Sequence, residues 1–383
     1  HTPTTHVASG MRVDFVITEL FVGGAERCLT ELAIALAQQG DEVRVFSLGP
    51  LPEGQQRALV DRLGQAGIPV SSGQASSTVQ ILSVYQRLKK WFAESPPHVC
   101  QTFMYHANVL GTFAAQSIGV DVRIGGLRVA EYRPIRNAIE RAAIRRMQHL
   151  VCVSRAVGDF AAAHLRCDRD RIAVIPNGVD VSRFATVAPI DWPSIGWPAD
   201  SRVMLFVGRL HSQKGIELLQ QQVDQLAPPG SDRRLLLIGD GPLRARLEHW
   251  VATIGTDRVQ LLPWQSDIAP WMRGSRLLVL PSRYEGMPNV VLEAMAAARP
   301  VVCSHVEGIE ELLADSTQRQ SFPAGDSDTM QKLAGSFLSD ESISDVTGRE
   351  NQSRVRRDFS IPAMVDSYRA LYRTLRDTRR RDD

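Results

Sequence analysis

Two glutamates follow one expected strand at a spacing that suits nucleotide binding. Glu285 lies in the loop after the strand at 276–280, and Glu293 lies about one turn inside the next helix, at 289–298, for which Pro288 suits the first turn. A helix N-terminus can hold a phosphate, and a carboxylate can accept hydrogen bonds from the vicinal hydroxyls of a ribose. Taken singly, each residue has a structural alternative: Glu285 caps the helix, and Glu293 belongs to a solvated helix face.

Two cations occupy a similar position earlier in the chain. Arg209 and Lys214 lie in the loop GRLHSQKG, at 208–215, which follows an expected strand at 202–207 and precedes an expected helix at 216–226. Two cations and a helix N-terminus on one loop can clamp a diphosphate. The alternative is two solvated surface residues. Only four residues of the chain are lysines, so a lysine beside a glycine in this loop favours binding.

A third candidate is the loop FVGGAE at 21–26, directly after the strand expected at 12–18. Gly23 and Gly24 let the backbone approach a ligand, and the helix expected at 25–39 offers free N–H groups to an anion. The pattern is not G-x-G-x-x-G, so the dinucleotide-binding fingerprint is absent. A tight strand-to-helix turn explains the two glycines equally well.

Short apolar strands alternate with amphipathic helices twice along the chain, which predicts two doubly wound α/β domains with parallel sheets. The expected strands lie at 12–18, 42–48, 99–103, 122–125, 150–154 and 172–175, and then at 202–207, 234–238, 259–262, 276–280 and 300–304. The proline-rich stretch at 181–200 has no periodicity and is predicted to be a linker. Open parallel sheets bind ligands at strand carboxyl ends, so the site is expected in the cleft between the domains.

These segments resemble, in order and spacing, the group 1 (family 4) retaining glycosyltransferases of the GT-B fold. The E-x7-E pair lies in SRYEGMPNVVLEAMA, and FVGGAERCLTELAIALAQQGDEV resembles the family's first β-α-β unit. The segments IAVIPNGVDVSRF, FVGRLHSQKG, LLLIGDGPLRARLE and DFSIPAMVDSYRALY follow in the family's order. The resemblance implies two Rossmann-like domains, an acceptor-side domain at 11–185 and a nucleotide-sugar-binding domain at 186–360. It also implies that a helix at 361–383 returns to the first domain.

The resemblance further implies an enzyme that moves a sugar from a nucleotide-diphospho-sugar, by family frequency a UDP-sugar, with retention of configuration. The acceptor would be a carbohydrate, a lipid-linked sugar or a small molecule, and neither a metal nor a cofactor is expected. The implied catalytic residues are Glu285, His106, Arg209 and Lys214. The implied donor-binding residues are Gly23, Gly24, Arg209, Lys214, Glu285, Gly286, Met287, Pro288, Asn289 and Glu293.

Each role is carried over from a matching motif. Glu285 would lie near the donor sugar, Glu293 on the donor ribose, and Arg209 and Lys214 on the diphosphate. His106, in QTFMYHANVLG, matches a histidine with which the family often touches the donor sugar. A lone histidine is otherwise more often structural.

Two departures from the family pattern lie near the donor motif. The family usually has a glycine where this chain has Ala298, and of its Gly-Gly-x-Pro-Glu loop only Gly308 and Glu311 match here. The altered loop puts the identity of the donor in doubt. Two other functions stay open: a GT-B sugar-nucleotide epimerase or phosphorylase, and a nucleotide-sugar-binding protein that has lost catalysis.

Composition limits the remaining classes. Of the 383 residues, 44% are hydrophobic and 22% are charged, which excludes a disordered or fibrous chain, and a net charge of +2 gives no field that favours nucleic acid. The five cysteines include no C-x-x-C pair, no apolar run reaches 18 residues, and the polar start does not read as a signal peptide. A cytoplasmic protein is therefore expected.

Basic residues concentrate in one part of the first domain. Residues 123–155 hold eight arginines against Glu131 and Glu140, a local charge of +6. Three interpretations compete: a solvated helix face, a site for a phosphate-bearing acceptor, and a contact with an anionic membrane surface. The last predicts peripheral association with the inner face of a membrane.

Overall fold

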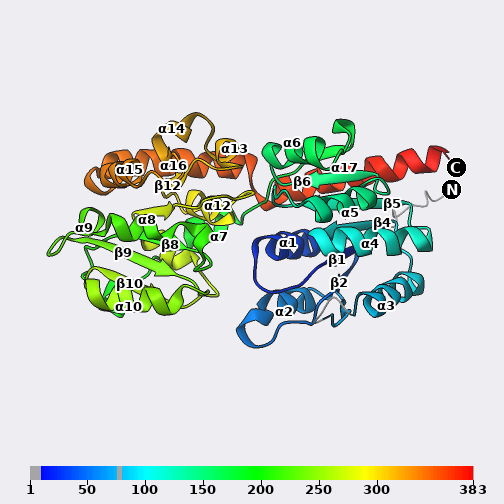
Figure 1. Cartoon of the computed structure of the whole chain (residues 1–383), viewed down its shortest axis with the longest axis horizontal. Coiled ribbons are helices and arrows are strands. Elements are labelled where there is room, and N and C mark those ends of the chain that lie inside the picture. The colour runs from blue at the N-terminus through cyan, green and yellow to red at the C-terminus, as the bar shows by residue number, and fades with distance from the viewer. Residues whose placement is uncertain (1–9, 76–79, 383) are drawn as a thin grey trace, which may run out of the picture. The chain divides into compact units, whose positions relative to one another are not determined.

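The structure is a computed structural model that describes residues 10–75 and 80–382. The polar start, residues 1–9, lies outside the described residues. The chain divides into two compact units, one formed by residues 1–177 with 361–383 and the other by residues 178–360 (Figure 1). Both are parallel-sheet α/β units, so the predicted fold class is confirmed.

The N-terminal unit is built on a seven-stranded sheet in the order β3-β2-β1-β4-β5-β6-β7, and all of its pairings are parallel. Its strands are β1 (Arg12–Ile17), β2 (Glu42–Ser47), β3 (Val70–Ser72), β4 (Val99–Phe103), β5 (Val122–Leu127), β6 (His149–Cys152) and β7 (Ile172–Val174). Its helices are α1 (Gly24–Gln38), α2 (Ala58–Gln65), α3 (Ile81–Glu94), α4 (Tyr105–Ile118), α5 (Pro134–Ile144), α6 (Arg155–His164) and α17 (Ile361–Asp382).

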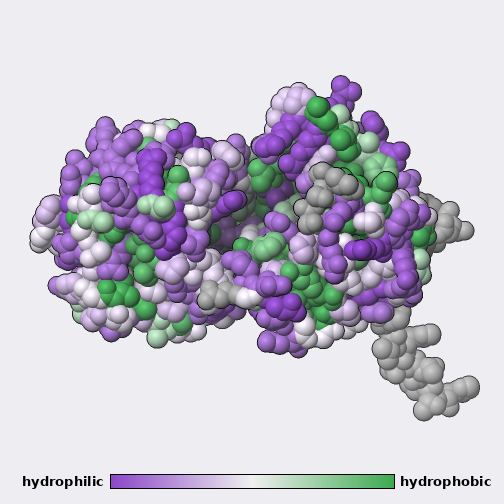
Figure 2. Space-filling view, turned by 60° about the horizontal axis from the view of Figure 1, so that its bottom comes forward, coloured by the Kyte–Doolittle hydropathy of each residue, from purple (hydrophilic) through white to green (hydrophobic). Residues whose placement is uncertain are grey.

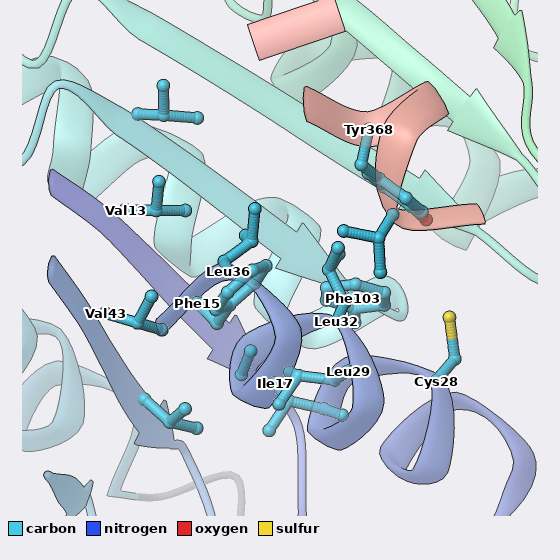
Figure 3. Close-up of a cluster of buried hydrophobic side chains, with 14 of the residues drawn as sticks. Val13, Phe15, Ile17, Cys28, Leu29, Leu32, Leu36, Val43, Phe103 and Tyr368 are labelled. Atoms are coloured by element: carbon cyan, nitrogen blue, oxygen red, sulfur yellow. The ribbon is translucent and has the colours of Figure 1, made fainter. Parts of the chain in front are cut away.

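The final helix, α17, completes the core of the N-terminal unit. Its Tyr368 packs with Phe15, Leu32 and Phe103 in the buried cluster between the sheet and α1 (Figure 3). Tyr372 is fully buried as well, and its hydroxyl donates to Gln101 Oε1 at 3.2 Å. Two large aromatic side chains buried in this way make the end of the chain an integral part of the N-terminal fold.

The C-terminal unit has a six-stranded parallel sheet in the order β10-β9-β8-β11-β12-β13. Its strands are β8 (Arg202–Val207), β9 (Arg233–Ile238), β10 (Val259–Leu262), β11 (Leu277–Leu280), β12 (Val301–Ser304) and β13 (Ser321–Phe322). Its helices are α7 (Val181–Thr186), α8 (Ile216–Gln221), α9 (Val223–Leu226), α10 (Arg244–Ile254), α11 (Ala269–Gly274), α12 (Asn289–Ala296), α13 (Ile309–Leu313), α14 (Thr317–Gln320), α15 (Ser327–Ser339) and α16 (Glu341–Asp358).

The predicted linker at 181–200 is wrong. Its first residues form α7, which packs on α11 and α12. Trp192 and Trp197 are buried, and the ring of Trp192 also lies against Trp271. Burial of these aromatic rings ties the segment into the C-terminal unit, so the boundary between the units falls at 177–178 rather than at 185–186.

Two helices are shorter than the sequence suggested. The helix expected at 216–226 breaks at Gln222 into α8 and α9, and the helix expected at 289–298 ends at Ala296. Ala298 then adopts a φ of +57°, in the left-handed region that ends a helix, although it is not a glycine. Within the described part of the chain, no helix is both long and apolar enough to span a membrane.

Candidate active site

The predicted donor residues of the C-terminal unit come from two neighbouring strands. β8 and β11 pair directly and run parallel, so their carboxyl ends lie at one edge of the sheet. The loop at 208–215 leaves β8 with Arg209 and Lys214, and the loop at 281–288 leaves β11 with Glu285. The strand order therefore places the loop of Glu285 beside the loop of Arg209 and Lys214, although about seventy positions separate the two loops in the sequence.

The two loops are joined by one backbone–backbone and one side chain–backbone hydrogen bond. Arg283 N donates to Gln213 O at 2.8 Å, and Gln213 Nε2 donates to Tyr284 O at 3.0 Å. Gly215 has a φ of +61°, and a Cβ at this position would lie 2.0 Å from Pro281 O. Only a glycine permits this approach, which holds Lys214 against the loop that carries Glu285.

One carboxylate oxygen of Glu285 is the centre of the site. Glu285 Oε1 accepts a hydrogen bond from Lys214 Nζ at 2.5 Å and another from Ser282 Oγ at 2.6 Å. The side chains of Lys214 and Glu285 are 17% and 10% exposed, and Ser282 is buried. Partial burial strengthens such an ion pair, and two donors on one oxygen fix the orientation of the carboxylate.

The remaining predicted residues of this unit differ in exposure. Arg209 is exposed, and its guanidinium makes no hydrogen bond or ion pair with the residues that the structure describes. Glu293 is buried at 8% exposure, one turn inside α12. Arg209 is thus the positive group most available to an anion, whereas Glu293 is not the solvated helix residue that the alternative required.

The donor-loop residues after Glu285 are mostly buried and lead directly into α12. Gly286 and Met287 are buried, Pro288 is the N-cap of α12, and Asn289 is its first residue. The altered loop at 307–311 packs directly on them: Gly308 has a φ of +79°, and a Cβ there would lie 2.4 Å from Gly286 O. The loop that departs from the family pattern therefore lies against the donor motif.

In the N-terminal unit, the glycine loop begins α1. Gly23 is the N-cap, Gly24 is the first helical residue, and the carboxylate of Glu26 folds back over Gly23, where a Cβ would lie 2.3 Å from Glu26 Oε2. Glu26 is buried, and burial raises its pKa to about 7, with the neighbouring Glu19 acting in the same direction. Sequence reasoning missed Glu26. Its position three residues after the N-cap of a helix was the available signal.

His106 follows a strained backbone position. Met104, the N-cap of α4 directly after β4, has φ 72° and ψ 162°, a region that residues other than glycine rarely adopt and that typically costs about 1–3 kcal/mol. The ring of His106 lies edge-on to the ring of Tyr105. The guanidinium carbon of Arg136 lies over the Tyr105 ring, 4.2 Å from its centroid. Burial and the positive charge of Arg136 lower the pKa of His106, so the imidazole is neutral near pH 7 and can accept or donate a hydrogen bond.

The predicted residues therefore divide between the two units. Arg209, Lys214, Glu285 and Glu293 belong to the C-terminal unit, and Gly23, Gly24 and His106 to the N-terminal unit. Among the described residues, no group of three or more histidine, cysteine or acidic side chains could hold a metal ion. The C-terminal cluster combines two cations with a carboxylate whose orientation is fixed, an arrangement that suits an anionic ligand.

Comparison with known proteins defines the class. Residues 22–183 match the family described as Glycosyltransferase Family 4, and residues 201–340 match Glycosyl transferases group 1. The chain belongs to the group 1, family 4 glycosyltransferases, and its activity is that of a glycosyltransferase.

Named relatives act on different acceptors. The chain is 25% identical to the UDP-Gal:alpha-D-GlcNAc-diphosphoundecaprenol alpha-1,3-galactosyltransferase of Escherichia coli, over 76% of this chain and 78% of that protein. It is 29% identical to the 2-deoxystreptamine glucosyltransferase of Streptomyces kanamyceticus, over 73% of this chain and 81% of that protein.

Solved structures show the same fold at low sequence identity. HepE of Anabaena, determined with UDP and glucose, superposes with a TM-score of 0.82 at 19% identity, covering 94% of this chain and 99% of that one. Sucrose-phosphate synthase of Thermosynechococcus elongatus gives a TM-score of 0.79 at 20% identity, covering 95% and 99%. These likenesses identify the fold as GT-B.

Proposed function

We propose that the protein transfers a sugar from a nucleotide-diphospho-sugar to an acceptor with retention of configuration and without a metal. The observation that carries this proposal is the contact of Lys214 and Ser282 with one oxygen of Glu285, with Arg209 on the same pair of loops. Two cations beside an oriented carboxylate suit a diphosphate joined to a sugar. The family to which the chain belongs supports the assignment.

The cations act on the leaving group. As the bond between the anomeric carbon and the diphosphate breaks, the departing nucleoside diphosphate gains negative charge, which Arg209 and Lys214 stabilise. Glu285 faces the sugar, where positive charge develops at the anomeric carbon, and Glu293 accepts from the ribose hydroxyls. The neutral His106 is a hydrogen-bond partner for the donor sugar.

Retention follows from attack on the face that the leaving group vacates. The acceptor oxygen forms its bond to the anomeric carbon, and its proton passes to an oxygen of the departing phosphate. We assign no protein nucleophile. Positive charge for the leaving group comes from Arg209 and Lys214, so no cofactor or metal has a step in this scheme.

A UDP-sugar is the donor that we propose. Support comes from the UDP-Gal donor of the galactosyltransferase relative and from the UDP in the HepE structure. The acceptor is a lipid-linked or a small-molecule sugar, since the two relatives named above divide between these classes. All five cysteines are buried and unpaired, which supports a reducing, cytoplasmic compartment.

A thermal-shift screen tests donor binding. Uridine, guanosine and adenosine diphosphates and their sugars are compared at one shared concentration, and a ligand present at about 100 times its dissociation constant stabilises the fold by ~2.7 kcal/mol. The proposal expects the uridine series to raise the melting temperature most. Stabilisation by a nucleotide-sugar that is neither hydrolysed nor transferred would instead support the non-catalytic binding protein.

We also propose peripheral contact with an anionic membrane through the start of α5. Val129, Tyr132, Ile135 and Ile139 are exposed there, Ile135 by 80%. On the face that Figure 2 draws, groups of hydrophobic residues lie between hydrophilic ones. An exposed aromatic and aliphatic group flanked by arginines suits the interface of an acidic bilayer.

The arginines of this region contribute less free charge than their number suggests. Arg123 donates to Arg146 O, Arg141 donates to Asn137 O, and Arg133 pairs with Glu131. The apolar residues therefore carry more of the proposed contact than the sequence indicated. Cosedimentation with vesicles containing phosphatidylglycerol should fall in Ile135→Ser but not in Leu82→Ser, a 77% exposed leucine on α3. Equal cosedimentation of wild type with neutral and anionic vesicles would contradict the proposal.

A further inference from the structure

Three arginines lie close together at the amino ends of β11 and β12, whereas the donor motif lies at the carboxyl end of β11. Arg273 lies in the last turn of α11, Arg276 directly precedes β11, and Arg299 precedes β12 by two residues. Leu278 pairs with Val301, and extending this parallel register by two residues places Arg276 beside Arg299. The donor loop leaves the other end of β11, which at four residues is ~13 Å long.

These guanidinium groups have few partners among the described residues. Arg276 Nη1 lies 3.4 Å from Glu341 Oε1, and Arg299 Nε donates to Ala297 O at 3.2 Å. Arg273 makes no side-chain hydrogen bond or ion pair with the residues described, and the Nε atoms of Arg273 and Arg276 are both buried without an acceptor. Each guanidinium carries five N–H donors, so most donors of the cluster have no acceptor within the described part of the chain.

Helix α16 contacts the segment that carries Arg299. α16 packs against the backbone of this segment, because Asn351 Nδ2 donates to Arg299 O at 3.0 Å and a Cβ at Gly348 would lie 2.1 Å from Ala298 O. The acids of this helix nearest to the cluster are Glu341 and Asp345, and both are exposed. Burial and the positive charges of Arg273 and Arg276 lower the pKa of Arg299.

We propose that Arg273, Arg276 and Arg299 form a second anion site, which binds a small phosphate or pyrophosphate group. Half-buried guanidinium groups with unused donors match phosphate oxygens in geometry and charge, and an anion would relieve their mutual repulsion. The three side chains are half-buried between α11, the sheet and α16, so a small free anion fits better than a lipid surface. This inference does not depend on the donor assignment.

Calorimetric titration with pyrophosphate tests the site, provided that binding at the donor loops is removed first. The double variant Arg209→Ala/Lys214→Ala should retain one pyrophosphate site. Adding Arg299→Gln should abolish that site, whereas adding Arg319→Gln should not, because Arg319 is an exposed arginine of the same unit paired with Glu350. Absence of binding in the double variant, or unchanged binding after Arg299→Gln, would overturn the proposal.

The melting temperature gives a second, independent readout. In phosphate-free buffer Arg299→Gln should melt at or above the wild-type temperature, because the substitution removes repulsion. With pyrophosphate, the melting temperature of Arg209→Ala/Lys214→Ala should rise, and that of the same double variant carrying Arg299→Gln should not. Arg273→Gln, which removes no hydrogen bond, should behave in the same way and serves if Arg299→Gln fails to fold. An equal loss of stability in both buffers for Arg273→Gln would overturn the site.

Discussion

Lys214 Nζ and Glu285 Oε1 lie 2.5 Å apart, although their loops leave different strands of the C-terminal sheet. The contact means that the lysine next to the proposed diphosphate position already has a carboxylate partner, and that the two loops are linked by an ion pair. A donor diphosphate must therefore share Lys214 with Glu285. Arg209, which has no such partner among the described residues, supplies the charge that is not shared.

Replacing Lys214 should remove stabilisation of the departing diphosphate. We expect Lys214→Ala to lower kcat by about 10²–10³-fold, the usual effect of losing one donor to a developing negative charge. Lys332→Ala, at an exposed lysine of α15, is the matched control and should keep wild-type activity. Steady-state kinetics with the donor found by thermal shift gives the measurement, and an active Lys214→Ala would contradict the clamp.

Ser282 is expected to position Glu285. Its hydroxyl donates to the same oxygen as Lys214, and a hydrogen bond to a charged group contributes about 1.5–3 kcal/mol. Ser282→Ala should therefore lower kcat/KM by roughly tenfold or more. Ser304→Ala is a close control, since Ser304 is a buried serine at the end of the neighbouring strand β12 whose hydroxyl has no partner among the described residues. Equal losses in the two variants would show that Ser282 acts through packing alone.

Ala298 should be a site of backbone strain. Its φ of +57° costs an alanine roughly 1 kcal/mol relative to glycine. Ala298→Gly should accordingly raise the free energy of unfolding by about 1 kcal/mol, as measured by urea denaturation. Ala297→Gly, one residue earlier at an ordinary φ of −76°, should not stabilise the protein. If both substitutions destabilise it, the strain at Ala298 is negligible.

Glu26 should make stability depend on pH. Its pKa is about 7 in the folded protein and near 4.5 when unfolded, so between these values the unfolded chain loses a proton that the folded protein keeps. The contribution of Glu26 to the free energy of unfolding is therefore fully present below pH 4.5. It is lost as the pH rises to 7, by up to about 3 kcal/mol.

The substitution Glu26→Gln should remove that fall. In urea unfolding at pH 5 and pH 8, the free energy of unfolding of the variant relative to that of wild type should be higher at pH 8 than at pH 5. Glu31→Gln, at a glutamate of the same helix paired with Arg62, should follow the wild-type profile. Identical pH profiles for wild type and Glu26→Gln would show that the carboxyl is ionised throughout.

The sequence was sufficient for the alternation of strands and helices, because buried parallel strands are short apolar runs and their helices are amphipathic. It could not supply strand order, so the contact of Lys214 with Glu285 and the meeting of Arg276 with Arg299 were not predictable from spacing. The burial of Glu26 could not be predicted either. The sequence indicated its glycine loop as a candidate site, but not that the Glu26 carboxylate folds over Gly23. Trp192 and Trp197 show the opposite case, in which a proline-rich stretch resembled a linker but holds aromatic residues of a core.

The most direct test of the account is release of nucleoside diphosphate from a UDP-sugar, compared between wild type, Lys214→Ala and Lys332→Ala. We predict turnover, by hydrolysis or by transfer to an added acceptor, for wild type and Lys332→Ala, with a loss of about 10²–10³-fold for Lys214→Ala. Turnover that is unchanged in Lys214→Ala, or a wild-type protein that binds the UDP-sugar without releasing UDP, would contradict the proposed catalytic role of the loops after β8 and β11.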